Sequence, residues 1–337
     1  MAVSAEDLEN RIVYVNGEYV PARDARISIF DRGFLFGDGI YEVTAVLEGK
    51  LIDSEPHMRR LRRSTGEIGI PMPMDENEIV AVERELIRRN NLTEGLVYLQ
   101  VTRGDGRDRD FVPAKGMKPS VVLFTQEANL LDKPALKTGA RVLSLEDLRW
   151  KRRDIKTVCL LPQALAKEIA KNAGCDEAWM IEDGYVTEGA SSTAYIVTQD
   201  DVIVTRPNSN SILPGCTRLS LLQLIAETGM KLEERLFTID EAYAAKEAFL
   251  TSAGTFVTPI TVIDEKSIGD GKPGPVARRL REIYLDHARR TAICGTTHPF
   301  FFAPHPELVE GSKGEGKRTT PALVFEASLR SAPQDEG

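Results

Sequence analysis

The sequence has little cysteine, no excess of positive charge and no long apolar run. Its four cysteines, at positions 159, 175, 216 and 294, form no Cys-x-x-Cys pair, which excludes a disulfide-dense scaffold and is typical of a reducing cytoplasm. The formal net charge of −8 argues against a nucleic-acid partner, because phosphate binding requires a basic face. No apolar run approaches the roughly 20 residues of a membrane-spanning helix. We therefore expect a soluble cytoplasmic protein with neither a nucleic acid nor a membrane as its partner.

Local motifs of several enzyme classes are also missing. The sequence contains no P-loop, no His-Glu-x-x-His and no Gly-x-Ser-x-Gly, so kinases, zinc hydrolases and serine hydrolases lack support. The four histidines are too dispersed for local spacing to assemble a metal site, and we expect no metal. The opening MAVSAEDLENR has neither a basic head nor an apolar core, so we expect no signal peptide.

Strand and helix patterns both occur throughout, which predicts a mixed α/β (α+β) fold. The Asn16-Gly17 pair between two apolar runs predicts a hairpin, and Asp75 with Glu78 predicts a capping box that opens a helix. A polar loop over 104–118 separates two expected strands and is long enough to be functional. Further strands are expected over 139–144, 177–181, 192–198 and 202–205, and helices over 162–173, from 216 onward and over 276–292.

The length of 337 residues suggests two domains. The segment 129–139 contains Pro134 and few candidate core residues, so we place the boundary there. We expect an N-terminal α/β domain over 1–128, a linker over 129–139 and a C-terminal domain over 140–291. From about 292 to 337 the composition shifts to proline, glycine and serine without periodicity, which predicts a disordered tail.

Two residues are candidates for a catalytic or cofactor-binding role. Lys156 lies between a charged stretch and an apolar run, and alternation places it on the opposite side from Ile155 and Thr157. Glu188 lies in a run of small residues just before a strong strand. Taken singly, Lys156 is typical of a solvated strand lysine and Glu188 of a turn residue.

Together they belong to a longer series of motifs. The sequence reads Asn-Gly-x-x-Val-Pro at 16–21, Arg-Gly-Phe-x-Phe-Gly-Asp-Gly-Ile-Tyr-Glu at 32–42, and His-x-x-Arg-Leu at 57–61. Asp-Ile-Lys-Thr follows at 154–157, then Thr-Glu-Gly-x-Ser-Ser at 187–192, Leu-Pro-Gly-x-Thr-Arg at 213–218 and Thr-Pro-Ile at 258–260. In this order they resemble the fold-type IV pyridoxal-phosphate enzymes from about residue 12 to 290, and most closely the D-amino-acid aminotransferases.

The resemblance implies that 140–291 is the domain that binds pyridoxal 5′-phosphate, with the cofactor in a cleft between the domains. Lys156 would attach covalently to the cofactor and, once freed, move a proton between the substrate Cα and the cofactor. Glu188 would face the pyridine nitrogen and keep it protonated, because an adjacent carboxylate favours the charged ring. A protonated ring is the electron sink for a carbanion.

The resemblance also implies how the phosphate is bound. Arg60 would pair with it, and the turn at Cys216 and Thr217, which opens a helix, would offer backbone N–H groups. Leu213 would pack against the ring. Relatives usually have a phosphate-binding threonine at the position of Ala253, so Ser252 or Thr255 would take that role here.

The same family suggests a substrate and leaves alternatives open. We expect transfer of an amino group between a D-amino acid, such as D-alanine or D-glutamate, and a 2-oxo acid. Tyr41 would contact the substrate, and either Arg107 or Arg109 would bind its carboxylate, because the usual Arg-x-His pair is absent from this loop. A branched-chain L-amino-acid transaminase, an (R)-amine transaminase, an aminodeoxychorismate lyase or a non-catalytic cofactor-binding protein are the alternatives. By analogy we expect a homodimer.

Overall fold

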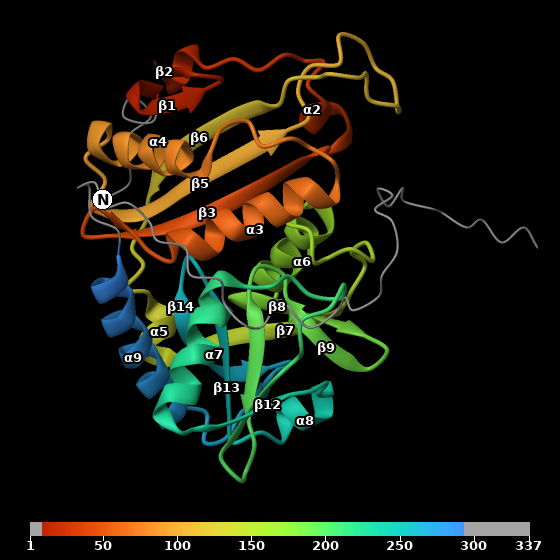
Figure 1. Cartoon of the computed structure of the whole chain (residues 1–337). Coiled ribbons are helices and arrows are strands. Elements are labelled where there is room, and N and C mark those ends of the chain that lie inside the picture. The colour runs from red at the N-terminus through yellow and green to blue at the C-terminus, as the bar shows by residue number, and fades with distance from the viewer. Residues whose placement is uncertain (1–8, 293–337) are drawn as a thin grey trace, which may run out of the picture. The chain divides into compact units, whose positions relative to one another are not determined.

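The computed structural model describes residues 9–292 of the chain (Figure 1). The tail predicted from 292 onward lies, apart from Ala292, outside the described residues. All described residues fall within one compact unit. None of the helices within 9–292 is both long enough and apolar enough to cross a lipid bilayer.

The first half of the chain forms a six-stranded antiparallel sheet in the order β2-β1-β6-β5-β3-β4. Its strands are β1 Ile12–Val15, β2 Glu18–Pro21, β3 Gly39–Leu47, β4 Lys50–Leu51, β5 Glu94–Thr102 and β6 Ser120–Glu127. The helical segments are η1 Ala22–Asp24, α2 Arg32–Phe36, α3 Ser54–Glu67 and α4 Glu76–Arg89. Helices α3 and α4 cover one face of this sheet, and their apolar residues form a core with it (Figure 1).

Two local predictions in this half are confirmed. Asn16 and Gly17 both have positive φ angles, of 50° and 107°, as a tight hairpin between β1 and β2 requires. Asp75 caps α4 by accepting a hydrogen bond from the Glu78 amide, and the Glu78 carboxylate accepts one from the Asp75 amide in return. These turn and cap residues set where the chain reverses and where the helix begins.

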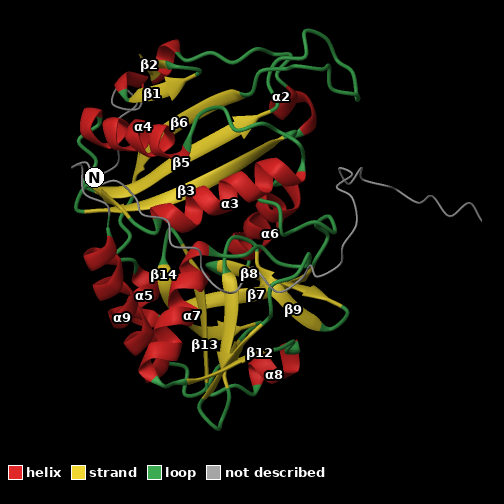
Figure 2. Cartoon of the chain, viewed as in Figure 1, coloured by secondary structure: helices red, strands yellow, loops and turns green. Residues whose placement is uncertain are grey.

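The second half forms a nine-stranded mixed sheet in the order β12-β11-β10-β13-β14-β7-β8-β9, with β15 beside β14. Its strands are β7 Ala140–Glu146, β8 Glu177–Glu182, β9 Tyr185–Gly189, β10 Thr193–Val197, β11 Val202–Thr205, β12 Lys231–Glu234, β13 Glu247–Ser252, β14 Phe256–Ile263 and β15 Lys266–Ser267. The helices are α5 Pro134–Thr138, α6 Leu161–Asn172, α7 Cys216–Thr228, α8 Ile239–Tyr243 and α9 Pro275–Thr291. Figure 2 shows helices beside strands in both halves, which confirms the mixed fold class.

The predicted linker lies between the two sheets in the chain. Strand β6 ends at Glu127, β7 begins at Ala140, and the short helix α5 lies in between. A shared hydrophobic core joins the two sheets, with Ala45 of β3 packed in the same cluster as Phe249 of β13 and Tyr284 of α9. The division of the chain into two domains at this segment stays a prediction.

Strand β9 was not predicted from the sequence. Glu188 lies within this strand. The turn is at Asp183 and Gly184, whose φ angles of 54° and 82° join β8 to β9 in a hairpin. The Asp-Gly pair was the signal for this hairpin, and the small residues after Glu188 concealed the strand.

Asp53 is one of the residues that tie the start of α3 to the second half. It stands before α3 with a φ of 52°, and its carboxylate accepts hydrogen bonds from Ser220 of α7 at 2.9 Å and from the Tyr284 hydroxyl of α9 at 2.5 Å. Tyr284 is 1% exposed, so its hydroxyl has no access to water as an alternative partner.

We predict that Asp53→Ala lowers the free energy of unfolding more than Asp183→Ala does. Both substitutions place alanine in a left-handed conformation, which costs roughly 1–2 kcal/mol. Only Asp53→Ala also leaves a buried hydroxyl without a partner, at a further cost of about 1–3 kcal/mol. Urea unfolding of the two variants measures the difference. Equal losses would show that the two hydrogen bonds contribute nothing.

Candidate active site

A cavity of about 350 Å³ brings together all the predicted site residues except the two loop arginines. Its walls come from β3, α3, the segment between β7 and α6, strand β9, the turn before α7 and the turn between β13 and β14. The predicted residues that line it are Tyr41, Arg60, Lys156, Glu188, Leu213, Cys216, Thr217, Ser252, Ala253 and Thr255.

Lys156 reaches the cavity because the backbone on both sides of it is bound to the start of β3. The Tyr41 amide donates to the Lys156 carbonyl at 3.0 Å, and Thr157 forms a backbone bridge with Ile40. Ile155 and Thr157 are buried, which leaves Lys156 to point the other way, as the alternation predicted. Its Nζ lies 4.1 Å from the centre of the Tyr41 ring, and among the described residues no carboxylate pairs with it. The ammonium of Lys156 is therefore a cation of the cavity wall without an ion-pair partner among residues 9–292.

Glu188 is a buried carboxylate held by two donors. Arg149 Nη1 donates to Oε1 at 2.5 Å, and the Leu213 amide donates to Oε2 at 3.1 Å. Burial raises the pKa of Glu188 because it disfavours the charged form, whereas the Arg149 guanidinium and the Leu213 amide oppose that rise. The two donors fix the carboxyl group of Glu188 in position beside Leu213.

Arg149 is a site residue that the sequence analysis missed. It lines the cavity, is buried, and is oriented by Asp147, which accepts from its Nε at 2.9 Å and its Nη2 at 2.7 Å. The available signal was the cluster of arginines that precedes Lys156 in a chain of net negative charge. Trp150 beside it also lines the cavity and is 46% exposed. The other tryptophan, Trp179, is fully buried in the core of the second sheet.

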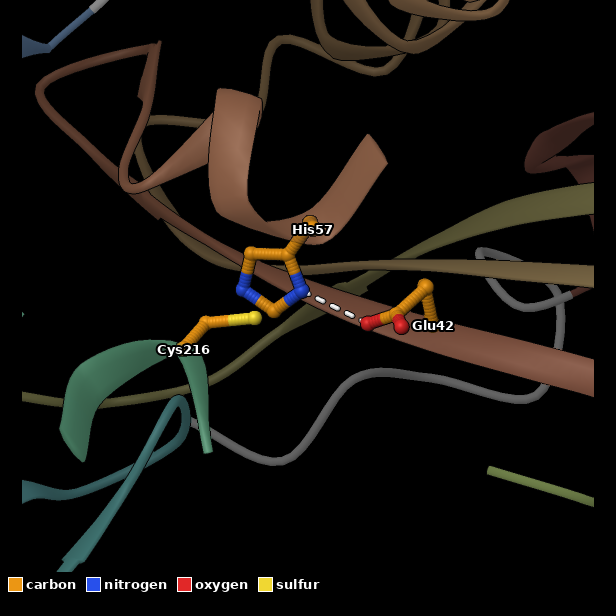
Figure 3. A group of neighbouring side chains, drawn as sticks. All are labelled: Glu42, His57 and Cys216. Atoms are coloured by element: carbon orange, nitrogen blue, oxygen red, sulfur yellow. Dashed lines mark hydrogen bonds and ion pairs between the residues drawn. The ribbon is translucent and has the colours of Figure 1, made fainter. Parts of the chain in front are cut away.

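Arg60 joins the two halves at the cavity. Its Nε and Nη2 donate to the Glu42 carboxylate at 2.8 and 2.7 Å, and its Nη1 donates to the Pro214 carbonyl at 2.9 Å. Glu42 also accepts from His57 Nδ1 at 2.7 Å, and Cys216 approaches the same imidazole from α7 (Figure 3). The guanidinium and the imidazole already engage both oxygens of Glu42, so this group is an ion-pair cluster and a poor cation site.

The charged groups in this cluster shift one another's pKa values. Burial acts to raise the pKa of Glu42, but Arg60 and His57 outweigh it and lower that pKa to about 2. Burial acts to lower the pKa of His57, but Cys216 and Glu42 outweigh it and raise that pKa to about 10. At neutral pH Glu42 is therefore ionised and is bound by the Arg60 guanidinium and the His57 imidazole, and Arg60 and His57 both border the cavity.

The N-terminus of α7 forms another wall. Its cap residue, Gly215, provides no side-chain hydrogen bond, and the first intrahelical bond runs from the Leu219 amide to the Gly215 carbonyl. The amides of Cys216 and Thr217 therefore precede the first intrahelical donor, the Leu219 amide, and both residues border the cavity. Orphan amides, the helix dipole and Arg60 together suit an anion such as a phosphate.

The turn between β13 and β14 completes the cavity with hydroxyl groups. Ser252 Oγ and Thr255 Oγ1 lie 2.8 Å apart and both residues line the cavity, as Ala253 does without a hydroxyl. Either hydroxyl can therefore donate to an anion at this wall, which leaves the choice between Ser252 and Thr255 open.

The two loop arginines lie elsewhere. Arg107 and Arg109 are exposed on the loop between β5 and β6 and do not line the cavity. The guanidinium of Arg109 lies over the rings of Phe36 and Phe111, at 5.3 and 4.9 Å from their centres. Tyr41, by contrast, stacks on Tyr98 at 5.7 Å and borders the cavity directly.

Comparison with known proteins agrees with this geometry. The model of the amino-transferase class IV family matches residues 39–263, and the chain belongs to that family. The chain is 37% identical to a D-alanine aminotransferase of Staphylococcus aureus (strain MSSA476), and the match covers 80% of this chain and 95% of the relative. It is 39% identical to a D-alanine aminotransferase of Bacillus licheniformis, with 80% of this chain and 94% of the relative covered. Among solved structures, the T.th. branched-chain amino acid aminotransferase with pyridoxamine 5′-phosphate is similar at a TM-score of 0.77 and 27% identity, over 83% of this chain and 95% of that one.

We predict a pH-dependent contribution of His57 to stability. Its pKa is raised from 6.5 to about 10 in the folded protein, so the stabilisation is complete below pH 6.5 and is lost as the pH rises toward 10. The difference in unfolding free energy between the wild type and His57→Gln should therefore be larger at pH 6 than at pH 10. Chemical unfolding at both pH values measures it, with His287→Gln on α9 as the control. A difference that stays constant or grows between pH 6 and pH 10 would contradict the assignment.

Proposed function

We propose that this chain is a pyridoxal-phosphate-dependent transaminase that moves an amino group between a D-amino acid and a 2-oxo acid. One observation carries the proposal: a single cavity combines an unpaired amine, a buried carboxylate and an anion-binding wall. These are the parts that the aldehyde, the ring nitrogen and the phosphate of this cofactor require. The 37–39% identity to D-alanine aminotransferases supports the choice of D-amino acids.

The residues present fit the cofactor. The phosphate would be held by Arg60, by the amides of Cys216 and Thr217, and by Ser252 or Thr255. Leu213 would lie against the ring, since its amide is bound to Glu188 Oε2 and its side chain borders the cavity. The similar structure with pyridoxamine 5′-phosphate supports the same choice of cofactor.

Each residue would then have a defined task in the reaction. When bound, pyridoxal phosphate supplies an electron sink for the carbanion at the substrate Cα. The Lys156 amine removes the proton from that Cα, and a positioned base of this kind contributes typically about 10²–10⁴-fold to the rate. Glu188 holds a proton at the ring nitrogen, and Arg149 favours the anionic form of Glu188 that this requires. The centre of the Tyr41 ring lies 4.1 Å from Lys156 Nζ, so the ring restricts where the amine can move.

A branched-chain L-amino-acid transaminase is the second candidate. The structural similarity to the T.th. branched-chain enzyme favours it, but that identity of 27% is lower than the 37–39% to the D-alanine enzymes. An (R)-amine transaminase and an aminodeoxychorismate lyase share the family resemblance without a specific observation in their favour. The experiment below separates the D-amino-acid, L-amino-acid and amine reactions, and a protein that responds to none of these substrates would point to the lyase.

The holoenzyme should lose its visible cofactor absorbance when mixed with D-alanine or D-glutamate and keep it with L-leucine or (R)-phenylethylamine. In turnover assays, Lys156→Ala should lower kcat at least about 10²-fold, because it removes the amine placed to move the proton. Lys151→Ala, at an exposed lysine five positions earlier, is the control and should leave kcat unchanged. A spectral response to L-leucine alone would favour the second candidate, and unaltered turnover in Lys156→Ala would refute the whole assignment.

We also propose that two copies of the chain form a homodimer through the region around α2. Large apolar side chains are exposed on α2, on the loop between β5 and β6 and at the start of α6, at Phe34, Phe111, Val112 and Leu161. These segments are adjacent: Phe36 of α2 lies 5.4 Å from Phe111, and Cys159 donates to the Gly37 carbonyl. Exposed apolar groups of this size mark interaction surfaces. The same loop carries Arg107 and Arg109, one of which would bind the substrate carboxylate in the second copy.

Light scattering should give a mass twice the 37.3 kDa of one chain, and Phe34→Glu should reduce it to that of one chain. The reason is that Phe34 is 74% exposed in one chain and a carboxylate there would have to be buried in the dimer. Leu236→Glu, at another exposed apolar residue, is the control and should leave the mass unchanged. A wild type with the mass of one chain would contradict the dimer.

We place the protein in the cytoplasm. Cys159, Cys175 and Cys216 are all unpaired in the described part of the chain. Free thiols, one of them exposed, are typical of a reducing compartment. The substrates are small amino acids and 2-oxo acids, which need neither a membrane nor a nucleic acid as partner.

A further inference from the structure

The cations that line the cavity differ in one respect, which is whether a carboxylate pairs with them. Among the described residues, all four arginines that line the cavity form ion pairs: Arg60 with Glu42, Arg149 with Asp147 and Glu188, Arg153 with Glu182, and Arg218 with Glu234. The two lining lysines, Lys133 and Lys156, have no such partner within residues 9–292. Lys156 removes a proton in the proposed reaction, whereas that reaction gives Lys133 no role.

Lys133 is held at the cavity by a short segment of fixed backbone. Glu94 Oε1 accepts hydrogen bonds from the amides of Leu130 and Leu131, which ties the segment before α5 to strand β5. The Lys133 ammonium donates to the Gly254 carbonyl at 2.8 Å. An ammonium has three donors, so two remain for a ligand in the cavity.

The surroundings of Lys133 favour an anion. Arg281 of α9 binds the same turn, and among the described residues it donates to the carbonyls of Thr255, Val257 and Leu130. Burial, and then Arg281, lower the pKa of Lys133, so a carboxylate bound beside it would relieve an unfavourable environment. A half-buried cation without a carboxylate is uncommon unless a ligand supplies one.

We propose that Lys133 binds the side-chain carboxylate of an acidic substrate, a D-amino dicarboxylic acid or the matching 2-oxo dicarboxylic acid. This inference rests on the proposed function and adds the residue that selects among its substrates. The cofactor would occupy Lys156, Glu188 and the α7 wall. A substrate attached there would then extend its side chain along the wall formed by Leu130, Lys133 and Gly254. A D-alanine side chain would make no use of Lys133.

The test compares two substrates in one set of holoenzymes. For each variant we would measure kcat/KM with D-glutamate and with D-alanine, and the affinity for pyridoxal phosphate. Lys133→Met should lower the ratio of kcat/KM for D-glutamate to kcat/KM for D-alanine by about 10- to 100-fold, as expected for the loss of a hydrogen bond between charged groups. Lys133→Arg keeps the charge and should keep most of the ratio. The control Lys137→Met, at an exposed lysine of α5 paired with Asp132, should leave the ratio unchanged.

Each alternative role of Lys133 gives a different result. If Lys133 only held the Gly254 turn or bound the phosphate, Lys133→Met would weaken cofactor binding and lower both kcat/KM values equally, and the proposal would be overturned. An equal loss without weaker cofactor binding would assign Lys133 to the α-carboxylate and would overturn it as well. A wild type that uses D-alanine but not D-glutamate would also overturn it. Failure of the wild type with both D-amino acids would instead refute the proposed function.

Discussion

The guanidinium of Arg60 is the group on which the arrangement of the cavity depends. It is bound on one side by the Glu42 carboxylate of β3 and on the other by the Pro214 carbonyl, which belongs to the turn before α7. Removing one partner of a buried ion pair typically costs about 3–5 kcal/mol, because an uncompensated charge stays in the interior. The position of the α7 N-terminus relative to β3, and hence that of the anion-binding wall relative to Lys156, follows from this interaction.

The charge of the cavity differs from that of the chain. The protein as a whole carries a net charge of −8, yet the described residues that line its cavity include six lysines and arginines and a single carboxylate, Glu188. Pairing explains how such a cavity is tolerated, since all four of the described arginines that line it form ion pairs with carboxylates. The remaining positive field attracts anionic substrates into the cavity, while the negative exterior opposes association with other acidic molecules.

The sequence allowed the local structure to be predicted where short motifs decide it. Asn16-Gly17 and the Asp75–Glu78 box act within a few residues, and both predictions are confirmed. Strand β9, which contains Glu188, was missed because it is defined by pairing with β8 rather than by its own side chains. Of the site residues that the family resemblance implied, all except Arg107 and Arg109 line the cavity.

Residues that act through distant partners could not be found in this way. Arg149 and Lys133 look like ordinary surface residues in the sequence, and only the fold shows that Arg149 binds Glu188, 39 residues away, and that Lys133 binds the Gly254 carbonyl, 121 residues away. No local spacing encodes contacts of that length. The proposed role of Arg107 or Arg109 requires a second copy of the chain, because neither residue lines the cavity of its own chain.

The two tryptophans give the protein a built-in optical reporter. Trp150 lines the cavity and is partly exposed, whereas Trp179 is fully buried in the core of the second sheet. A chromophore that enters the cavity would quench the emission of Trp150 at once, while the emission of Trp179 would change chiefly on unfolding. Intrinsic fluorescence can therefore follow filling of the cavity and loss of the fold as two separate events in one sample.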